Sequence, residues 1–147
     1  MIRTDFILKM IRKITNNEDT NRYSDQDLMV WLNQAQRIIQ MAVFSSNPNH
    51  RLFSAEGTIN VVSGTSEYTL PTDIFGENTI YFVELSYDDG VKYYPIDPVT
   101  PQEKDIINGY YIRNNKIILT PEPGFTSTAG IKVTYMKNLY SMSVRNA

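Results

Sequence analysis

Two segments in the first 46 residues carry apolar side chains at the three- and four-residue spacing of buried helix faces. The first stripe consists of Ile7, Met10, Ile11 and Ile14, and it predicts a helix over residues 4–15 with this stripe buried. The second stripe predicts a longer helix that ends near residues 44–46, before Asn47-Pro48-Asn49; its members are Leu28, Trp31, Leu32, Ala35, Ile38, Ile39, Ala42 and Val43. Because the connection between the two is short and polar, we expect them to pack as a helical hairpin.

The second helix has a clear start signal. Ser24 is a good N-cap residue, and Asp27 stands three residues later, where an acid can complete a capping box. Tyr23, just before the cap, is expected to pack on Leu28 as a hydrophobic staple. The basic residues of the first helix lie off its apolar stripe, and the expectation is a solvated face; they are Lys9, Arg12 and Lys13.

From residue 55 onward the pattern changes to the two-residue period of strands, interrupted by turns. Strands are predicted at 57–62, 68–70, 79–87, 91–96, 110–113, 116–119 and 131–136. Three turns predict hairpins between successive strands: residues 63–66, Asp88-Asp89-Gly90 and Asn114-Asn115. A capping box from Thr100 to Glu103 predicts a helix of about two turns that stops at Asn108-Gly109.

The predicted fold class is therefore α+β, with a mostly antiparallel β region. Residues 1–55 are expected to form the helical pair, and residues 56–136 a β-rich region packed with it as one domain. Residues 137–147 have no periodic pattern and are predicted to be an extended C-terminal tail.

Composition removes several classes of chemistry. The chain of 147 residues has no Cys and one His, which excludes disulfides, thiolate metal sites, thiol nucleophiles and sites that need two imidazoles. It has a net charge of −2, and residues 56–136 hold five Lys and Arg against eleven Asp and Glu. A nucleic-acid binder usually carries a dense basic face, so tight phosphate binding by this segment is not expected. No apolar run is long enough to span a bilayer, and the charged N-terminus does not resemble a signal peptide.

The remaining candidates for chemistry have ordinary structural explanations. His50 lies in a loop without the context of a catalytic triad. Asp88-Asp89 is better explained as a turn than as a metal site. A carboxylate pair for glycoside hydrolysis has four candidates, of which the sequence selects none: Glu56, Glu67, Glu84 and Asp97. The sequence therefore predicts no catalytic residue, no metal ligand and no cofactor.

Aromatic residues point instead to protein contacts. The chain has ten Tyr and six Phe, and three adjacent pairs lie in predicted strands: Tyr81-Phe82, Tyr93-Tyr94 and Tyr110-Tyr111. Neighbouring strand residues face opposite ways, so each pair places one ring outside the sheet core. Exposed tyrosines are typical of interfaces. The predicted interface residues are Trp31, Tyr81, Tyr94, Tyr111, Leu139, Tyr140, Met142 and Arg145.

Four segments, in this order, resemble a known family. YSDQDLMVWLNQAQR (residues 23–37) resembles the second helix of tailed-phage head-to-tail adaptor proteins, also called connector or head-completion ring proteins. VSGTSEYTLPTDI (62–74) is similar to the turn and strand with the pattern g-x-x-x-Y-x-L-P-x-D that follows in that family. YYIRNNKIILTPEP (110–123) and IKVTYM (131–136) fit the end of the same pattern. Short-tailed and crAss-like phage adaptors are the most similar in kind.

The resemblance implies a virion structural protein without enzymatic activity. Such adaptors form a ring, commonly of twelve copies, under the portal protein at the unique capsid vertex. They extend the DNA channel, through which DNA passes without sequence-specific binding, and they offer a docking surface to the tail or to a second ring protein. The resemblance also implies assembly in the host cytoplasm, and no contact with a membrane.

Two other classes of protein stay open. One is a carbohydrate-binding or tail-fibre β module that uses exposed tyrosines as a sugar platform. The other is a small hydrolase with a carboxylate pair, for which Glu67 and Glu84 would be the residues to change.

Overall fold

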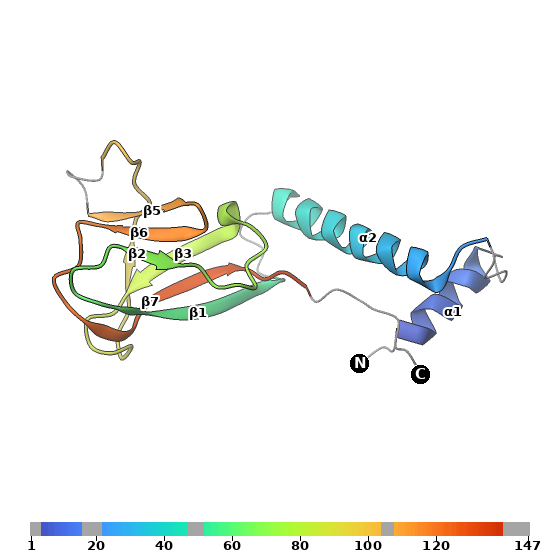
Figure 1. Cartoon of the computed structure of the whole chain (residues 1–147), viewed down its shortest axis with the longest axis horizontal. Helices are drawn as coiled ribbons and strands as arrows, with labels where there is room; N and C mark the ends of the chain where they lie inside the picture. Colours follow the sequence, from blue (N-terminus) through green and yellow to red (C-terminus); the bar gives the residue numbers. More distant parts are fainter. Residues whose placement is uncertain (1–3, 16–21, 47–51, 104–107, 140–147) are drawn as a thin grey trace. The chain divides into compact units, whose positions relative to one another are not determined.

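The computed structural model describes residues 4–15, 22–46, 52–103 and 108–139. Two compact units make up the chain: a helical unit that contains α1 (Thr4–Ile14) and α2 (Asp25–Ser46), and a β unit within residues 48–138. The described residues form two helices and seven strands, β1–β7, and Figure 1 labels all of these elements except β4. The α+β class and the bounds of both helices are as predicted. The packing of the β region with the helices as one domain stays a prediction.

The predicted capping box begins α2. The backbone amide of Ser24 and its hydroxyl donate to the Asp27 carboxylate at 3.0 and 2.7 Å, and the amide of Asp27 donates to Ser24 Oγ at 3.1 Å. These bonds hold the pKa of Asp27 below its usual range, chiefly through the Ser24 hydroxyl. The cap is thus formed by neighbours in sequence, which is why the sequence predicts it.

α1 packs on the start of α2 through a small core. Leu8, Leu28 and Met29 are buried there, and Tyr23 and Leu32 pack against them. The staple residue Tyr23 therefore lies against the predicted helix start. This core is small for a pair of helices, and it uses one turn at the beginning of α2.

The prediction for the faces of α1 was wrong for three residues, whereas Ile7 and Ile11 are half-buried and Lys9 and Lys13 are exposed. Met10 and Ile14 of the predicted buried stripe are exposed, whereas Arg12, expected in solvent, is buried. Arg12 lies near Leu8 on the face toward α2, and its guanidinium contacts the Asp25 carboxylate at 2.6 Å and the carbonyl of Tyr23 at 2.9 Å. An ion pair across the helices thus takes the place that the pattern assigned to an apolar side chain.

The β unit has two antiparallel sheets. The four-stranded sheet has the order β1-β7-β3-β4, and the three-stranded sheet has the order β2-β6-β5. Figure 1 shows these as two layers. Their strands are β1 (Ser54–Val61), β2 (Glu67–Thr69), β3 (Ile80–Leu85), β4 (Tyr94–Ile96), β5 (Gly109–Arg113), β6 (Lys116–Thr120) and β7 (Ser127–Met136). A 3-10 turn, η1 (Glu77–Thr79), precedes β3.

One hydrophobic core lies between the two sheets. Both sheets contribute alternate residues to it, which is the arrangement of a β-sandwich. The buried members are Val61, Tyr68, Leu70, Val83, Leu85, Tyr110, Ile117, Leu119, Ile131, Val133 and Tyr135.

Two of the three predicted hairpins are confirmed. β5 and β6 pair across Asn114-Asn115, whose φ angles of 52° and 59° fit a tight hairpin turn. β3 and β4 pair around Asp89 and Gly90, with φ angles of 55° and 82°, although the connection is longer than the turn alone.

The prediction of a hairpin between the first two strands was wrong. β1 pairs with β7, and β2 pairs with β6 in the other sheet. The turn at residues 63–66 therefore carries the chain from one layer to the other. The paired residues of β1 and β7 are 66 to 82 positions apart in sequence, and no local signal indicates this pairing.

The segment predicted as a short helix begins with its capping box. The hydroxyl of Thr100 donates to the Glu103 carboxylate at 2.8 Å, and the amide of Glu103 donates to the carbonyl of Thr100 at 2.9 Å. Residues 101–103 form a turn and no helix, and residues 104–107 lie outside the described residues.

Candidate functional site

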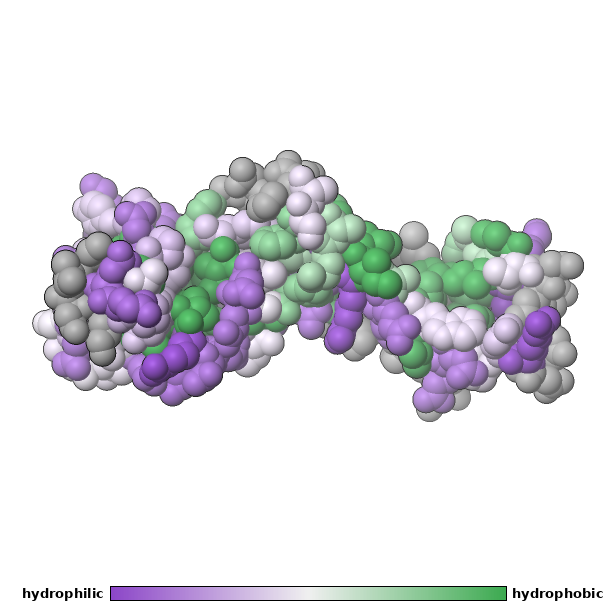
Figure 2. Space-filling model, turned by 90° about the horizontal axis from the view of Figure 1, so that it is seen from above, coloured by the Kyte–Doolittle hydropathy of each residue, from purple (hydrophilic) through white to green (hydrophobic). Residues whose placement is uncertain are grey.

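Most of the exposed large apolar side chains of the described residues lie on the helical unit. Eight large side chains there are 48 to 74% exposed: Phe6, Met10, Ile14, Val30, Trp31, Ile38, Ile39 and Met41. Figure 2 shows hydrophobic side chains gathered over the part of the molecule that holds the helices. Large apolar patches are rare on monomeric proteins, so a concentration of exposed apolar side chains of this kind is typical of an interface.

α2 is nearly without charge along most of its length. Arg37 is the one charged residue between positions 28 and 46. A helix that is apolar or neutral on all sides is normally surrounded by protein. Within the described residues, the apolar core that α2 shares with α1 lies at the beginning of α2 and consists of Leu8, Leu28 and Met29.

Trp31 is a partly exposed residue of this surface and not part of the helical core. Its side chain is 49% exposed, and one side of the ring meets Tyr23 edge-on, with the centroids 5.1 Å apart. The contact fixes the orientation of the indole while its other side stays accessible.

In the adjacent aromatic pairs of the β unit, the two rings differ in burial, as the alternation of strand residues predicts. Tyr110 is buried and Tyr111 is half-buried, while Tyr94 is more exposed than Tyr93. Tyr81 is half-buried and its neighbour Phe82 is exposed, at a point where the register between β3 and β7 shifts. Tyr94 stands 6.2 Å from Tyr87, and Lys92 lies over its ring at 5.0 Å. A small exposed aromatic group therefore lies beside the turn after β3.

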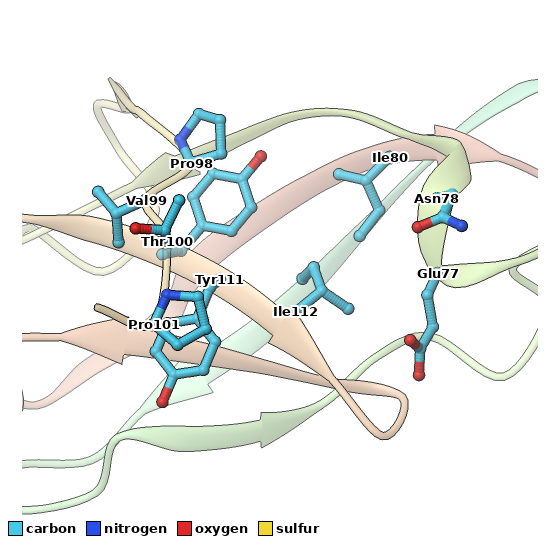
Figure 3. A pocket seen from close by; sticks show the side chains of 10 residues that line it. Glu77, Asn78, Ile80, Pro98, Val99, Thr100, Pro101, Tyr111 and Ile112 are labelled. Carbon is cyan, nitrogen blue, oxygen red and sulfur yellow. The ribbon is translucent and has the colours of Figure 1, made fainter. Parts of the chain in front are cut away.

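A surface depression of about 430 Å³ lies between η1, β5 and the segment after β4. Its walls are mostly apolar and aromatic, and Figure 3 shows the side chains of Ile80, Val99 and Ile112 among them. Glu77 is the one carboxylate among the lining residues, and it accepts a hydrogen bond from the backbone amide of Asn115. Burial raises the pKa of the Tyr110 hydroxyl, whose ring also lines the depression. This arrangement offers an apolar contact and no pair of groups for acid–base catalysis.

The acids singled out in the sequence hold structure together. Asp88 accepts hydrogen bonds from Ser86 Oγ at 2.7 Å and the amide of Lys92 at 2.9 Å, and Asp89 accepts one from the amide of Thr128 at 2.8 Å. The pKa of Asp88 is lowered, chiefly by the Ser86 hydroxyl. Both acids therefore support the predicted turn.

The two acids of the hydrolase alternative are in ion pairs. Glu67 pairs with Lys116 at 2.9 Å, and this hydrogen bond lowers the pKa of Glu67. Glu84 pairs with Lys132 at 2.8 Å, which raises the pKa of that lysine. A general acid needs a raised carboxyl pKa, and the lowered value at Glu67 is the opposite of that requirement.

The motif from Gly64 to Asp73 has structural roles. Gly64 takes a φ of 80° in the turn, and the hydroxyl of Tyr68 donates to the carbonyl of Thr65 at 2.6 Å. Asp73 accepts a hydrogen bond from the hydroxyl of Tyr135 at 2.6 Å and thereby ties the motif to β7. Burial, followed by this bond, raises the pKa of Tyr135.

Several predicted residues lie outside the described ones. They are His50, Tyr140, Met142 and Arg145, whereas Leu139 is described and half-buried. Within residues 4–15, 22–46, 52–103 and 108–139 there is no group of three or more acidic or histidine side chains suited to a metal ion. The described helices include none long and apolar enough to cross a membrane.

Sequence reasoning missed the outward side of α1. Phe6, Met10 and Ile14 follow one another at four-residue intervals, on the side away from Leu8 and Arg12. The four-residue spacing is visible in the sequence, but the pattern alone does not show which side of the helix faces α2.

Comparison with known proteins shows that the chain matches the model of one protein family. The model of the SU10 adaptor protein family matches residues 4–147. No curated protein matches the sequence. The match covers both the helical unit and the β unit, and it agrees with the adaptor motifs found along the sequence. The chain therefore belongs to the SU10 adaptor protein family.

Proposed function

We propose that this protein is a head-to-tail adaptor of a tailed phage, a structural component of the virion. Membership of the SU10 adaptor family carries the proposal. In this role copies of the chain form a ring, of twelve by the resemblance, that docks on the portal protein, extends the DNA channel and gives the tail or a second ring protein its attachment surface. The ring is assembled in the host cytoplasm, and the short-tailed or crAss-like type is the subtype that we propose.

Two observations support a structural role and no enzymatic one. The accessible apolar surface of α1 and α2 fits a protein that works through contacts with other proteins. Of the candidate acids, Asp88 and Asp89 are bound into a turn, and Glu67 and Glu84 are paired with lysines.

The charge distribution fits passage of DNA. Residues 56–136 carry eleven Asp and Glu against five Lys and Arg. A lumen lined by this segment would repel phosphates and let DNA slide without adhesion. Low affinity of the isolated protein for duplex DNA, at low as well as at high salt, is the expected result.

The direct test uses capsids that carry the portal of the same phage and lack tails. The purified full chain is mixed with these capsids, and bound protein is measured by sedimentation and located by electron microscopy. We expect a symmetric ring at one vertex. A stable closed dimer without affinity for these capsids would contradict the adaptor role.

We further propose that residues 137–147 are a docking arm for the portal or a neighbouring subunit. The segment carries Leu139, Tyr140, Met142 and Val144 with two cations and no acid. Deletion of residues 138–147 should leave the melting temperature of the isolated protein unchanged and sharply reduce its attachment to capsids. Full attachment of the deletion variant would mean that the segment is only a chain end.

A further inference from the structure

α1 carries apolar side chains on two opposite sides, and α2 of the same chain covers one of them. Leu8 and Arg12 face α2, and the ion pair of Arg12 with Asp25 fixes this orientation. The opposite side carries Phe6, Met10 and Ile14, which we call the outer stripe of α1. Because the helix is held by its inner side, α2 of the same chain is not available to cover the outer stripe.

α2 offers a matching surface beyond the turn that α1 covers. Trp31, Ala35, Ile38 and Ala42 recur at four- and three-residue intervals and are all exposed, so they form one line along the helix, the outer face of α2. Large and small side chains alternate in this line. The two alanines leave hollows between Trp31 and Ile38 and after Ile38, each about one helical turn from the next large side chain.

The occupant that fits this face is a helix with large apolar side chains one turn apart. The outer stripe of α1 has this spacing, since Phe6, Met10 and Ile14 stand four residues apart. Ridges at four-residue spacing pack into grooves of this kind on a neighbouring helix. We propose that the outer stripe of α1 in one copy packs on the outer face of α2 in the next copy, which makes this contact the seam of the ring; the inference rests on the proposed adaptor function.

The two patches are different, so the contact is head-to-tail. Each copy gives its α1 stripe to one neighbour and its α2 face to the other, and such a contact closes into a ring when the rotation permits. A two-fold dimer would instead bring identical patches together.

The size of the surface indicates a contact that is weak in isolation. A large side chain has roughly 150–200 Å² of surface, so the five large side chains of the two patches, which are 48 to 74% exposed, leave on the order of 500 Å². Each seam buries one α1 stripe and one α2 face, so this is also its total area. Stable interfaces bury about 1,200–2,000 Å² in total. The seam should therefore form in quantity only where a platform such as the portal gathers the copies.

The absence of Cys from the sequence permits a direct test by cross-linking. Two full-length variants, Met10→Cys and Ile38→Cys, are purified separately, mixed in equal amounts and treated with a short bismaleimide. The experiment is done with the free proteins at rising concentration and with the proteins bound to capsids that carry the portal of the same phage. Because each variant has one thiol, any link between positions 10 and 38 joins two copies.

We expect a 10–38 product that grows with concentration and dominates on the capsids. The matched control pair is Lys9→Cys with Arg37→Cys, which lie beside the two patches and should give several-fold less product. A melting temperature within error of the parent protein verifies that each variant folds.

The outcomes separate the seam from the adaptor function. Binding to capsids without a 10–38 excess over the control pair overturns the seam and leaves the adaptor role intact. A dominant 10–10 or 38–38 product also overturns it, because it shows a two-fold contact. A 10–38 excess without capsid binding supports the seam and contradicts the adaptor role. If neither the 10–38 excess nor capsid binding is observed, both the seam and the adaptor role are contradicted.

Discussion

Replacement of Arg12 by alanine tests how α1 is attached to α2. The guanidinium donates from Nη2 to Asp25 Oδ1 at 2.6 Å, from Nε to the same oxygen at 3.2 Å, and from Nη2 to the carbonyl of Tyr23 at 2.9 Å. The side chain of Arg12 is 10% exposed and that of Asp25 is 47% exposed. The pair is therefore buried on the arginine side and open to water on the aspartate side.

This difference in exposure determines how much free energy of unfolding is lost when Arg12 is replaced. Loss of one partner of a fully buried ion pair costs about 3–5 kcal/mol, because the other charge is left without solvent. Water reaches Asp25, so the cost should approach that of a hydrogen bond to a charged group, about 1.5–3 kcal/mol. We expect Arg12→Ala to destabilise the helical unit by about 2 kcal/mol. Arg12→Lys keeps the positive charge but lacks the planar guanidinium group that donates two hydrogen bonds to Asp25. We expect this variant to be destabilised by about half as much as Arg12→Ala.

The assay uses the one tryptophan of the chain. Trp31 lies on α2 in edge contact with Tyr23, so its fluorescence reports on the helical unit separately from the β unit. Denaturant unfolding of Arg12→Ala should show a lower midpoint with an unchanged slope. Lys13→Ala, an exposed neighbour, is the control and should stay within about 0.5 kcal/mol of the parent. A midpoint for Arg12→Ala equal to that of Lys13→Ala would refute the role of this ion pair.

Three further predictions concern the cap, the outer face of α2 and the sandwich core. Ser24→Ala should destabilise the helical unit by about 1 kcal/mol in the same fluorescence assay. The carboxylate of Asp27 has a lowered pKa in the folded state, so its stabilising effect is present at neutral pH and is lost as the pH falls through that lowered pKa. Ser24→Ala should reduce this acid dependence, and an identical pH profile would argue against the cap. Trp31→Ala should leave the melting temperature within a few degrees, because the side chain is 49% exposed, and should abolish ring formation on capsids; normal rings would exclude Trp31 from the seam. Ile131→Ala removes a fully buried side chain and should cost about 2–5 kcal/mol by calorimetry of the β unit, and a loss below 1 kcal/mol would contradict its place in the core.

Local signals in the sequence determined the elements of this protein. Ser24 and Asp27 stand three residues apart, and the hairpin turn at Asn114-Asn115 needs only its own residues to take positive φ angles. Such features form from contacts between near neighbours, so their energies can be inferred from the order of residues. Three of the four family motifs are of the same kind, because their residues form the capped start of α2, a turn with a short strand, and the β5–β6 hairpin.

Tertiary structure decided which elements meet. The order β1-β7-β3-β4 joins strands from opposite ends of the β region, and the gain from that pairing depends on a core that forms only when both sheets are present. The same reason explains the error at α1. An apolar stripe says that a side of a helix avoids water, but it does not say what covers it. The ion pair of Arg12 with Asp25 turned α1 so that Met10 and Ile14 face outward, and this rotation, set by a contact across 13 residues of sequence, created the surface that we assign to a neighbouring copy.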